Sequence, residues 1–378
     1  MLQIAKRFWG PETAATRPVP AQSPTRQAEA RLVETLDAAE RLWRDMAADA
    51  DSTVFQTWEV FQAWARTIAA GAQCRWFVSA LLDARTRKPL LLLPLVLRTE
   101  DGLDVIEGAD LGVADFYAPV IARGFVPTAA EMECYWSLMK HTFPTADLLR
   151  LSKMPQRIGR SRNPLLLLPN VNTIKLTNLK TALEPDWQAW LIANVPEKIR
   201  HDIAVRRRKL GKRGNLRLVT AETGAEADRF FAAMLAQRQE RYKALGRRDI
   251  LDDPNCRHFY RSLIRPGERN SVGTMQALLV DNEIVATGLG LVYNDAFHMI
   301  FPAFAGNGWR NYSPGLQLFF FSLEWAAARG FSHYDFTIGD ESFKRNLGAE
   351  EFPLYEKLVA ISAHGRQVVY MDRFRRFI

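Results

Sequence analysis

Apolar and polar positions alternate with two different periods along this chain, and both periods occur in each half of it. In the first half, apolar residues three or four positions apart predict helices at 29–49, 53–70 and 128–143. Apolar runs typical of buried strands occur at 75–84, 88–98 and 146–154, and the first two flank a turn as a hairpin. The stretch 115–120 predicts a short extended segment. Helices mixed with meandering strands indicate the α+β class.

The second half has a more informative order of elements. A strand at 215–221 precedes two helices, at 225–246 and 254–264. Three strands joined by tight turns follow as a β-meander, at 273–280, 283–293 and 296–304. The remaining elements are a helix at 314–329, a strand at 331–338, a short helix at 341–346 and a final hairpin of 354–362 and 366–372. The predicted order is therefore β-α-α-β-β-β-α-β-α-β-β.

Length and composition favour two globular domains. The chain has 378 residues, 48% of them hydrophobic, and about 150 residues per domain is the usual size. We expect a flexible tail at 1–27, rich in Pro, Thr, Ala and Ser, and domains at 28–178 and 179–378. The three cysteines are few and far apart, which indicates neither a disulfide framework nor a zinc site, and we expect no metal. The longest apolar run, at 90–97, is far shorter than the ~20 residues of a membrane span, so we expect a cytoplasmic protein.

The positive charge of the chain is concentrated in one segment. Residues 198–217 contain nine Lys or Arg and one Asp, which accounts for the net charge of +8. Ile199, Ile203 and Leu210 form one apolar face of a helix there, so the three consecutive arginines at 206–208 should point toward solvent or a partner. One interpretation is binding to anionic phosphates, whether of a nucleotide-linked substrate, a membrane surface or RNA, and a solvated helix face is the other. Because no aromatic residues are interleaved, single-stranded nucleic acid is disfavoured, and we expect no DNA partner.

A polar loop turns into an apolar helix at residues 306–330. Ser313 is predicted to cap this helix, and Pro314 suits its first position. Gly315 is unexpected in the first turn, because glycine in a helix costs roughly 0.5 to 1 kcal/mol relative to alanine. One explanation is that an anionic group approaches the backbone amides closely. The alternative is that the stretch is only a helix start, where the glycine serves capping or packing.

The residues from 310 to 348 resemble three related groups of transferases. The predicted order, with Arg310-Asn311-Tyr312-Ser313-Pro314-Gly315 before the helix, resembles the GCN5-related N-acetyltransferase (GNAT) fold and its loop of the form Arg/Gln-x-x-Gly-x-Gly/Ala. Ser313 departs from that pattern. "YSPG" followed by "DFTIGDESFK" resembles the CelD-like acetyltransferases associated with bacterial cellulose and exopolysaccharide genes. "FKRNLG" at 343–348 resembles the signature of Fem-type aminoacyltransferases, which contain two such folds in tandem. The resemblance implies tandem GNAT-like domains.

The resemblance also implies acetyl-CoA or another acyl-CoA as the co-substrate. Its pyrophosphate would contact the helix N-terminus through the amides of Tyr312, Ser313, Gly315 and Leu316 and the side chain of Arg310. Its pantetheine arm would lie between the fourth and fifth strands and pair with the main chain near Phe301 and Ala303. Pro302 predicts a bulge there, because proline in a strand belongs at an edge or a bulge.

Transfer to an amine requires a group that accepts the amine proton. Asp335 on the fifth strand and His298 on the fourth are candidate bases, although either can be purely structural, and Tyr312 is a candidate acid for the leaving thiolate. Lys344 is carried over from the Fem-type signature as a contact to the acceptor or to a phosphate. We expect the acceptor between the two halves, where Asp115 and Tyr117 are the first-half candidates.

Three function classes remain open from the sequence. The first is an acyl-CoA-dependent N-acyltransferase that acts on an amine of a sugar, peptide or envelope precursor. The second is a Fem-like enzyme that takes its acyl group from aminoacyl-tRNA, which the basic segment favours. The third is a non-catalytic binding protein, because Ser313 departs from the glycine pattern and no base is certain.

Overall fold

Both halves of the protein have the element order β-α-α-β-β-β-α-β when their shortest elements are set aside. The structure, a computed structural model, describes residues 27–46, 50–306, 308–367 and 369, so the tail expected at 1–27 lies almost entirely outside the described residues. The first half contains β1 (Ala28–Val33), α1 (Leu36–Met46), α2 (Trp58–Trp64), β3 (Cys74–Asp83), β4 (Pro89–Glu100), β5 (Leu103–Gly108), α3 (Ala129–Lys140) and β7 (Leu148–Pro155). The second half contains β11 (Leu216–Thr220), α6 (Gly224–Ala244), α7 (Pro254–Ser262), β12 (Gly273–Val280), β13 (Glu283–Tyr293), β14 (Ala296–Phe304), α8 (Pro314–Ala328), β15 (His333–Ile338) and α9 (Ser342–Asn346).

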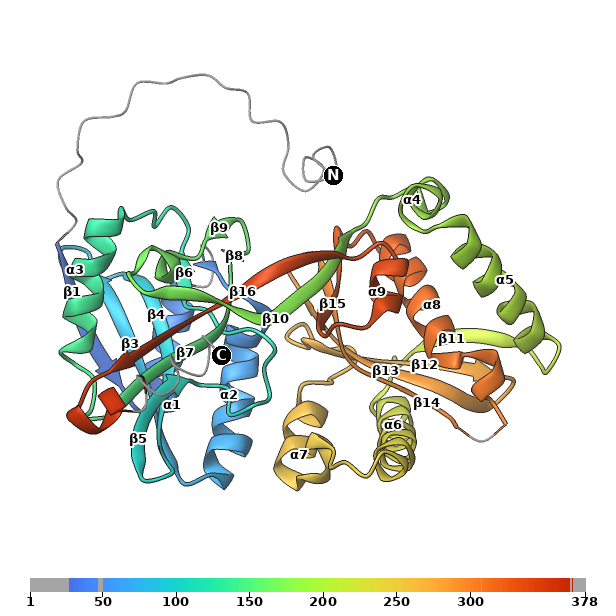
Figure 1. Cartoon of the computed structure of the whole chain (residues 1–378), viewed down its shortest axis with the longest axis horizontal. Coiled ribbons are helices and arrows are strands. Elements are labelled where there is room, and N and C mark those ends of the chain that lie inside the picture. Colours follow the sequence, from blue (N-terminus) through green and yellow to red (C-terminus); the bar gives the residue numbers. More distant parts are fainter. Residues whose placement is uncertain (1–26, 47–49, 307, 368, 370–378) are drawn as a thin grey trace, which may run out of the picture.

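Two long strands connect the halves, because each pairs with the half that does not precede it in sequence; we call this the strand exchange (Figure 1). β10 (Val171–Ala182) follows the first half in sequence but pairs with β15 of the second half. β16 (Glu350–Ala360) follows the second half but pairs with β7 of the first half, and β10 and β16 also pair with each other. All four strands therefore belong to one continuous 14-stranded sheet. The domain boundary expected between 178 and 179 falls inside β10.

Helices cover both faces of the sheet in each half. In the first half, α3 packs on one face and α1 and α2 on the other. In the second half, α8 packs on one face, and α6 and α7 on the other. Residues of α1, α2, α6 and α7 belong to a single hydrophobic core. The two halves are therefore packed against each other, and their shared surface is apolar.

Two helices, α4 (Trp187–Asn194) and α5 (Glu197–Gly211), precede the first strand of the second half. The side chain of Asp186 caps α4, because it accepts hydrogen bonds from the first-turn amides of the helix. α5 is the helix predicted from the basic segment, and it buries Ile203 and Leu210 as its apolar face. None of the described helices is long and apolar enough to cross a membrane.

Two of the predicted elements are wrong. The helix expected at 29–49 begins only at Leu36, because residues 28–33 form β1, which pairs with β3 along its whole length. Pairing with a neighbouring strand overrides the helix propensity of this Ala- and Glu-containing stretch. The final hairpin is also wrong, since residues 363–367 are helical. The strand expected at its start exists as β16, but its neighbours are β7 and β10.

Candidate active site

The fourth and fifth strands of the second half, β14 and β15, run parallel for three residue pairs and then separate. The last pair is His298 opposite Asp335. Just beyond it, the register between β14 and β13 shifts, so that Ile300 forms a bulge. The sequence predicted a bulge near Pro302, which itself pairs with Gly288. A bulge bends its strand and increases the local twist, which favours the separation of β14 from β15.

A cavity of about 620 Å³ lies where these strands separate, beside the N-terminus of α8. Apolar side chains from both strands and from α8 line it, among them Met299, Phe319 and Phe336. Five of the residues predicted to contact the co-substrate or acceptor also line it: Arg310, Ser313, Gly315, Leu316 and Lys344. The structure thus brings together residues that lie on the turn before α8, on α8 and on α9.

Three of the residues predicted to contact the co-substrate do not line this cavity. The ring of Phe301 packs against Tyr260 on α7, with ring centroids 4.7 Å apart, and Ala303 is buried in the same core. The main chain of both residues pairs with β13. Tyr312 lies against Trp309, with ring centroids 5.9 Å apart. The phenol of Tyr312 is therefore not placed as the acid that we expected at the cavity wall.

The first turn of α8 directs backbone amides toward the cavity. Helix geometry leaves the first amides of any helix without an intrahelical acceptor, and Gly315 and Leu316 occupy these positions. The amides of Tyr312 and Ser313, which we also expected to be free, donate to the carbonyl oxygens of Trp309 and Arg310 in a 3₁₀ turn. An anion at this helix end could therefore contact only the first-turn amides and the nearby cations.

Ser313 does not cap α8 with its side chain, which corrects the sequence-based expectation. The residue adopts a left-handed conformation (φ 51°), and its side chain makes no capping hydrogen bond. Its hydroxyl instead accepts a hydrogen bond from the guanidinium of Arg206 on α5. This contact links the basic helix to the N-terminus of α8, and it brings a cation to that end of the helix.

Gly315 has a packing role that the sequence could not reveal. A β-carbon at this position would lie 2.8 Å from a ring carbon of Phe304 on β14, closer than real β-carbons approach their neighbours. Phe304 lines the cavity as well. The glycine therefore allows α8 to approach β14 closely, in addition to any access that it gives to a ligand.

A Gly315→Val variant should consequently lose stability even without ligand. Inserting methyl groups into packed space typically costs 1 to 3 kcal/mol, because neighbouring side chains must shift. Chemical denaturation of the free protein would measure this loss. Combining the change with Phe304→Ala should recover part of the stability, since the ring that the valine meets is then absent. If Gly315→Val lowers the free energy of unfolding by the same amount in the wild type and in Phe304→Ala, contact with Phe304 does not explain the glycine.

The two candidate bases lie side by side at the point where the strands separate. Nδ1 of His298 is 3.4 Å from Oδ2 of Asp335, a long contact for a hydrogen bond, and both side chains are largely buried. Burial opposes ionisation of Asp335, but His298, Lys180 and the amide of Thr337 together keep the pKa of this carboxyl below its ordinary value. Asp335 is therefore a buried carboxylate that faces a histidine.

The neighbours of Asp335 include residues that sequence reasoning missed. Asn178 on β10 donates to Oδ2 (3.1 Å), and the amide of Thr337 donates to Oδ1 (2.7 Å). Lys180, also on β10, lies opposite Asp335 in the register, and burial lowers the pKa of its ammonium group. β10 comes from the other side of the strand exchange, so no local pattern could connect it with β15. Among the described residues, no group of three or more His, Cys, Asp or Glu side chains is placed to hold a metal ion.

Thr337 is a strained residue of the site. It adopts a positive φ of 61°, which is rare for a β-branched residue because its side chain crowds the backbone. The hydroxyl of Thr337 donates to the carbonyl of Met299 (3.4 Å), and the carboxyl of Asp115 in the first half lies beside it. Strain of this kind persists only where the surrounding contacts hold it, and it concentrates at functional sites.

Asp115 is therefore the first-half candidate that the structure brings to the site. Burial raises the pKa of this carboxyl, and the nearby Lys153 and Lys344 oppose the shift. Nζ of Lys344 is buried, donates to the carbonyl of Ile338 (3.2 Å) and pairs with Glu341 (2.9 Å). The other first-half candidate, Tyr117, lies in the first-half core, where its hydroxyl donates to the carbonyl of Pro94 (2.8 Å). Asp115 therefore lies near residues that line the cavity beside α8, whereas Tyr117 does not.

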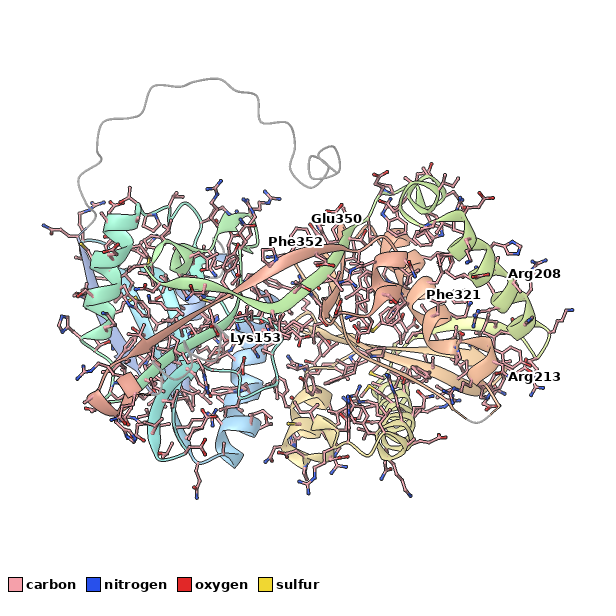
Figure 2. All side chains as sticks on the ribbon, in the orientation of Figure 1. Lys153, Arg208, Arg213, Phe321, Glu350 and Phe352 are labelled. Atoms are coloured by element: carbon pink, nitrogen blue, oxygen red, sulfur yellow. The ribbon has the colours of Figure 1, made fainter. Side chains whose placement is uncertain are left out.

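The three consecutive arginines of α5 have different surroundings. Arg206 contacts Ser313, and Arg207 lies over the ring of Phe321 on α8, 4.3 Å from its centroid. Arg208 is exposed, and Figure 2 shows it on the outer side of α5, with Arg213 at the same end of the molecule. Arg207 and Arg208 are both exposed, as expected for residues that point toward solvent or a partner, whereas Arg206 is half-buried against Ser313.

Comparisons with known proteins agree with this arrangement. A family model described as an acetyltransferase (GNAT) domain matches residues 197–345, and no curated protein matches the chain. The crystal structure of FemX is similar over 87% of this chain and 97% of its own, with a TM-score of 0.54 and 12% identity. A conserved protein of unknown function from Bacteroides thetaiotaomicron is similar over 86% and 98%, with a TM-score of 0.53 and 9% identity. These structures share the fold across both halves. Residues 197–345 therefore form an acetyltransferase domain of the GNAT family, and the protein is an N-acyltransferase.

Proposed function

We propose that the protein transfers an acyl group from acyl-CoA, in the simplest case acetyl-CoA, to an amine of a sugar, peptide or envelope precursor. The observation that carries this proposal is the cavity between the separated strands and the first turn of α8. The CelD-like and Fem-type resemblances of residues 312–348 support the class of acceptor.

The residues around the cavity fit a co-substrate with a pyrophosphate and a long apolar arm. The amides of Gly315 and Leu316 and the positive end of the helix dipole favour an anion. Arg310 and Arg241 line the same cavity and add positive charge. The apolar wall from β14 and β15 suits the pantetheine arm. When bound, acyl-CoA would supply the activated acyl group.

The polar residues beyond the cavity suit the acceptor amine. His298 is the proton acceptor in this proposal, because imidazole is the side chain that changes charge near neutral pH, and Asp335 holds it in position. Asp115 lies beside Thr337 and adds a carboxylate that can hold the ammonium form of the acceptor before it loses its proton. The acceptor would thus contact both halves of the chain.

Thermal unfolding with acetyl-CoA tests the donor assignment. Linkage predicts a stabilisation of roughly 2.7 kcal/mol when the ligand is a hundredfold above its dissociation constant. We expect acetyl-CoA to raise the Tm, and ATP at equal concentration to raise it less because it lacks the pantetheine arm. A Tm that does not change in millimolar acetyl-CoA, with calorimetry also flat, would overturn the donor assignment.

One observation favours a second candidate, a Fem-like enzyme that uses aminoacyl-tRNA. The basic helix α5 lies beside the N-terminus of α8, and its outer side carries the exposed cations Arg208, Lys209 and Lys212. Such a cationic surface suits a phosphate backbone, and it suits an anionic membrane surface equally. Adding uncharged tRNA as a further ligand in the thermal experiment separates the candidates. Stabilisation by tRNA alone, without any response to acetyl-CoA, would favour the second one.

A further inference from the structure

The first half contains a second place where two parallel strands separate. β5 and β7 pair in parallel for three residues and then part, as β14 and β15 do in the second half. The last pair before the separation is Glu107 opposite Arg150. By position in the repeated fold, this pair corresponds to His298 and Asp335. The first half has thus an ion pair where the second half has its candidate base.

The side of this separation that corresponds to the acyl-CoA cavity is closed. Tyr117 is fully buried there, and a β-carbon on Gly108 would lie 2.4 Å from its ring. The amide of Tyr117 donates to the carbonyl of Lys153 on β7 (3.1 Å), so a chain segment fills the gap between the strands. At the N-terminus of α3, which corresponds to α8, Thr128 and Glu131 form a capping box. The carboxylate of Glu131 would repel a pyrophosphate at that helix end.

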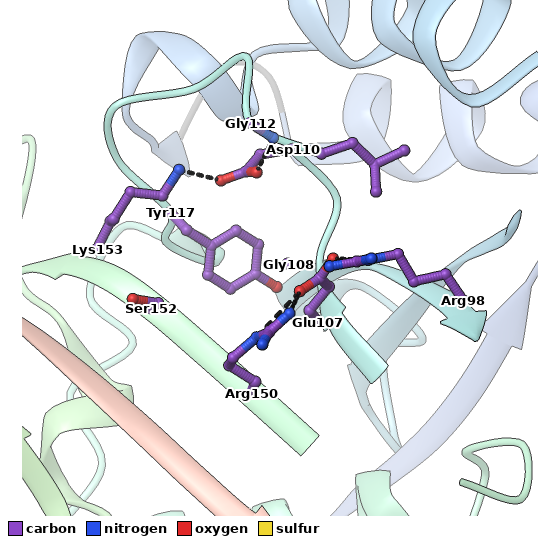
Figure 3. A pocket seen from close by; sticks show the side chains of 10 residues that line it. Arg98, Glu107, Gly108, Asp110, Gly112, Tyr117, Arg150, Ser152 and Lys153 are labelled. Atoms are coloured by element: carbon purple, nitrogen blue, oxygen red, sulfur yellow. Dashed lines mark hydrogen bonds and ion pairs between the residues drawn. The ribbon is translucent and has the colours of Figure 1, made fainter. Parts of the chain in front are cut away.

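The opposite side of the separation is open and charged (Figure 3). Ile106 and Leu149 belong to the core under α3, so Glu107 and Arg150, which alternate with them, face the other way. A cavity of about 490 Å³ lies on this side. Three cations and two carboxylates line it: Arg98, Arg150, Lys153, Glu107 and Asp110.

The contacts among these groups leave donors available for a ligand. Arg98 and Arg150 both bond Glu107, with shortest distances of 2.5 and 2.6 Å. Both also contact Glu100, through the Nη2 atom of each guanidinium (3.2 and 2.7 Å). Nη1 of neither guanidinium takes part in these contacts. Lys153 pairs with Asp110 at 2.6 Å. With Glu100 included, the three cations face three carboxylates, so what remains for a ligand is the Nη1 donors of the two guanidinium groups, which have no part in these ion pairs.

We propose that this cavity is a separate binding site for a small anionic group, a carboxylate or a phosphate, held by Arg98 and Arg150. Guanidinium groups suit both anions, because their paired N–H donors match two oxygen atoms. The cavity lies on the face that serves the acceptor in the second half. Tyr117 packs in the core on the donor side and also forms part of the cavity wall. The proposal does not depend on the identity of the acyl donor.

Ser152 offers a test that leaves the ion pairs in place. It lines the cavity from β7 and belongs to neither the ion pairs nor the candidate active site. Inorganic phosphate and acetate, each at constant ionic strength, are the probes, and thermal unfolding and calorimetry are the measurements. We expect at least one of them to raise the Tm of the wild type and of Ser152→Asn. In Ser152→Asp, the added carboxylate should weaken binding of that anion about tenfold or more by like-charge repulsion.

The control is acetyl-CoA, whose affinity should be the same in both Ser152 variants. Should Ser152→Asp unfold, Arg98→Gln replaces it, because it removes one donor and leaves Arg150 on Glu107. A response to phosphate but not acetate identifies a phosphate site, and the reverse identifies a carboxylate site. The proposal is overturned when neither anion binds the wild type, or when the response persists unchanged in Ser152→Asp and Arg98→Gln.

Discussion

An Asp335→Asn variant is expected to keep its fold and its affinity for acyl-CoA but to lose about a hundredfold or more in kcat, the usual size of a general-base contribution. Asp335 faces His298 and accepts hydrogen bonds from Asn178 and Thr337. An asparagine can still accept the bond from Thr337, but it has no charge to stabilise the imidazolium that forms when His298 takes up the amine proton. Steady-state kinetics with an amine acceptor would measure the loss.

His298→Gln is the matched variant, and we expect a loss of similar size. Near-normal activity of His298→Gln beside an inactive Asp335→Asn would identify Asp335 itself as the base. The pH dependence of stability provides a control. Because the pKa of Asp335 is lowered in the fold, its charge stabilises the protein above the ordinary aspartate pKa of about 3.9, and this contribution disappears as the pH falls further. The difference in unfolding free energy between wild type and Asp335→Asn should therefore narrow in acid.

A Ser313→Asp variant should fold as well as the wild type and lose acyl-CoA binding by tenfold to a hundredfold, which corresponds to roughly 1.4 to 2.7 kcal/mol. Ser313 has a left-handed backbone conformation, which aspartate tolerates better than most residues do. The new carboxylate would lie at the positive end of α8 beside Arg206, where it favours the helix. It would also occupy the region that we assign to the pyrophosphate, and it would repel a second anion there.

Ser313→Asn is the control, because it has the same shape without the charge. We expect it to bind acyl-CoA within a few-fold of the wild type. Calorimetry on both variants, with thermal unfolding in the absence of ligand, distinguishes a blocked site from a damaged fold. Equal affinity of the Asp and Asn variants would mean that no anion binds at this helix N-terminus.

The sequence predicted most elements of the second half because their signals are local. Asp281, Asn294 and Asp295 adopt the positive φ values that the predicted tight turns of the β-meander require. The helix after the meander begins at Pro314, as expected for a proline at the first helical position. Such features depend on a few neighbouring residues, so they form independently of how distant segments of the chain pack.

The features that could not be predicted depend on contacts between distant segments. Gly315 meets Phe304 only because α8 packs on β14, and Ser313 meets Arg206 only because α5 packs beside α8. The resemblance pointed to Asp335 and His298, which lie side by side where the strands separate, but it could not place Asn178 there, because the strand exchange brings β10 beside β15. The sequence predicts Tyr117 near the acceptor, whereas its ring fills the first-half core.

The exchange of β10 and β16 affects the order in which a newly made chain can fold. β7 of the first half pairs with β16, as in the pair Leu149 and Val359, so this edge of β7 has no partner until residues 350–360 have left the ribosome. An unpaired strand edge of this kind attracts other strands and promotes aggregation. Pairing between segments so distant in sequence is also slow. The halves of this protein must therefore complete each other after synthesis, and the nascent first half is the stage at which protection by chaperones matters most.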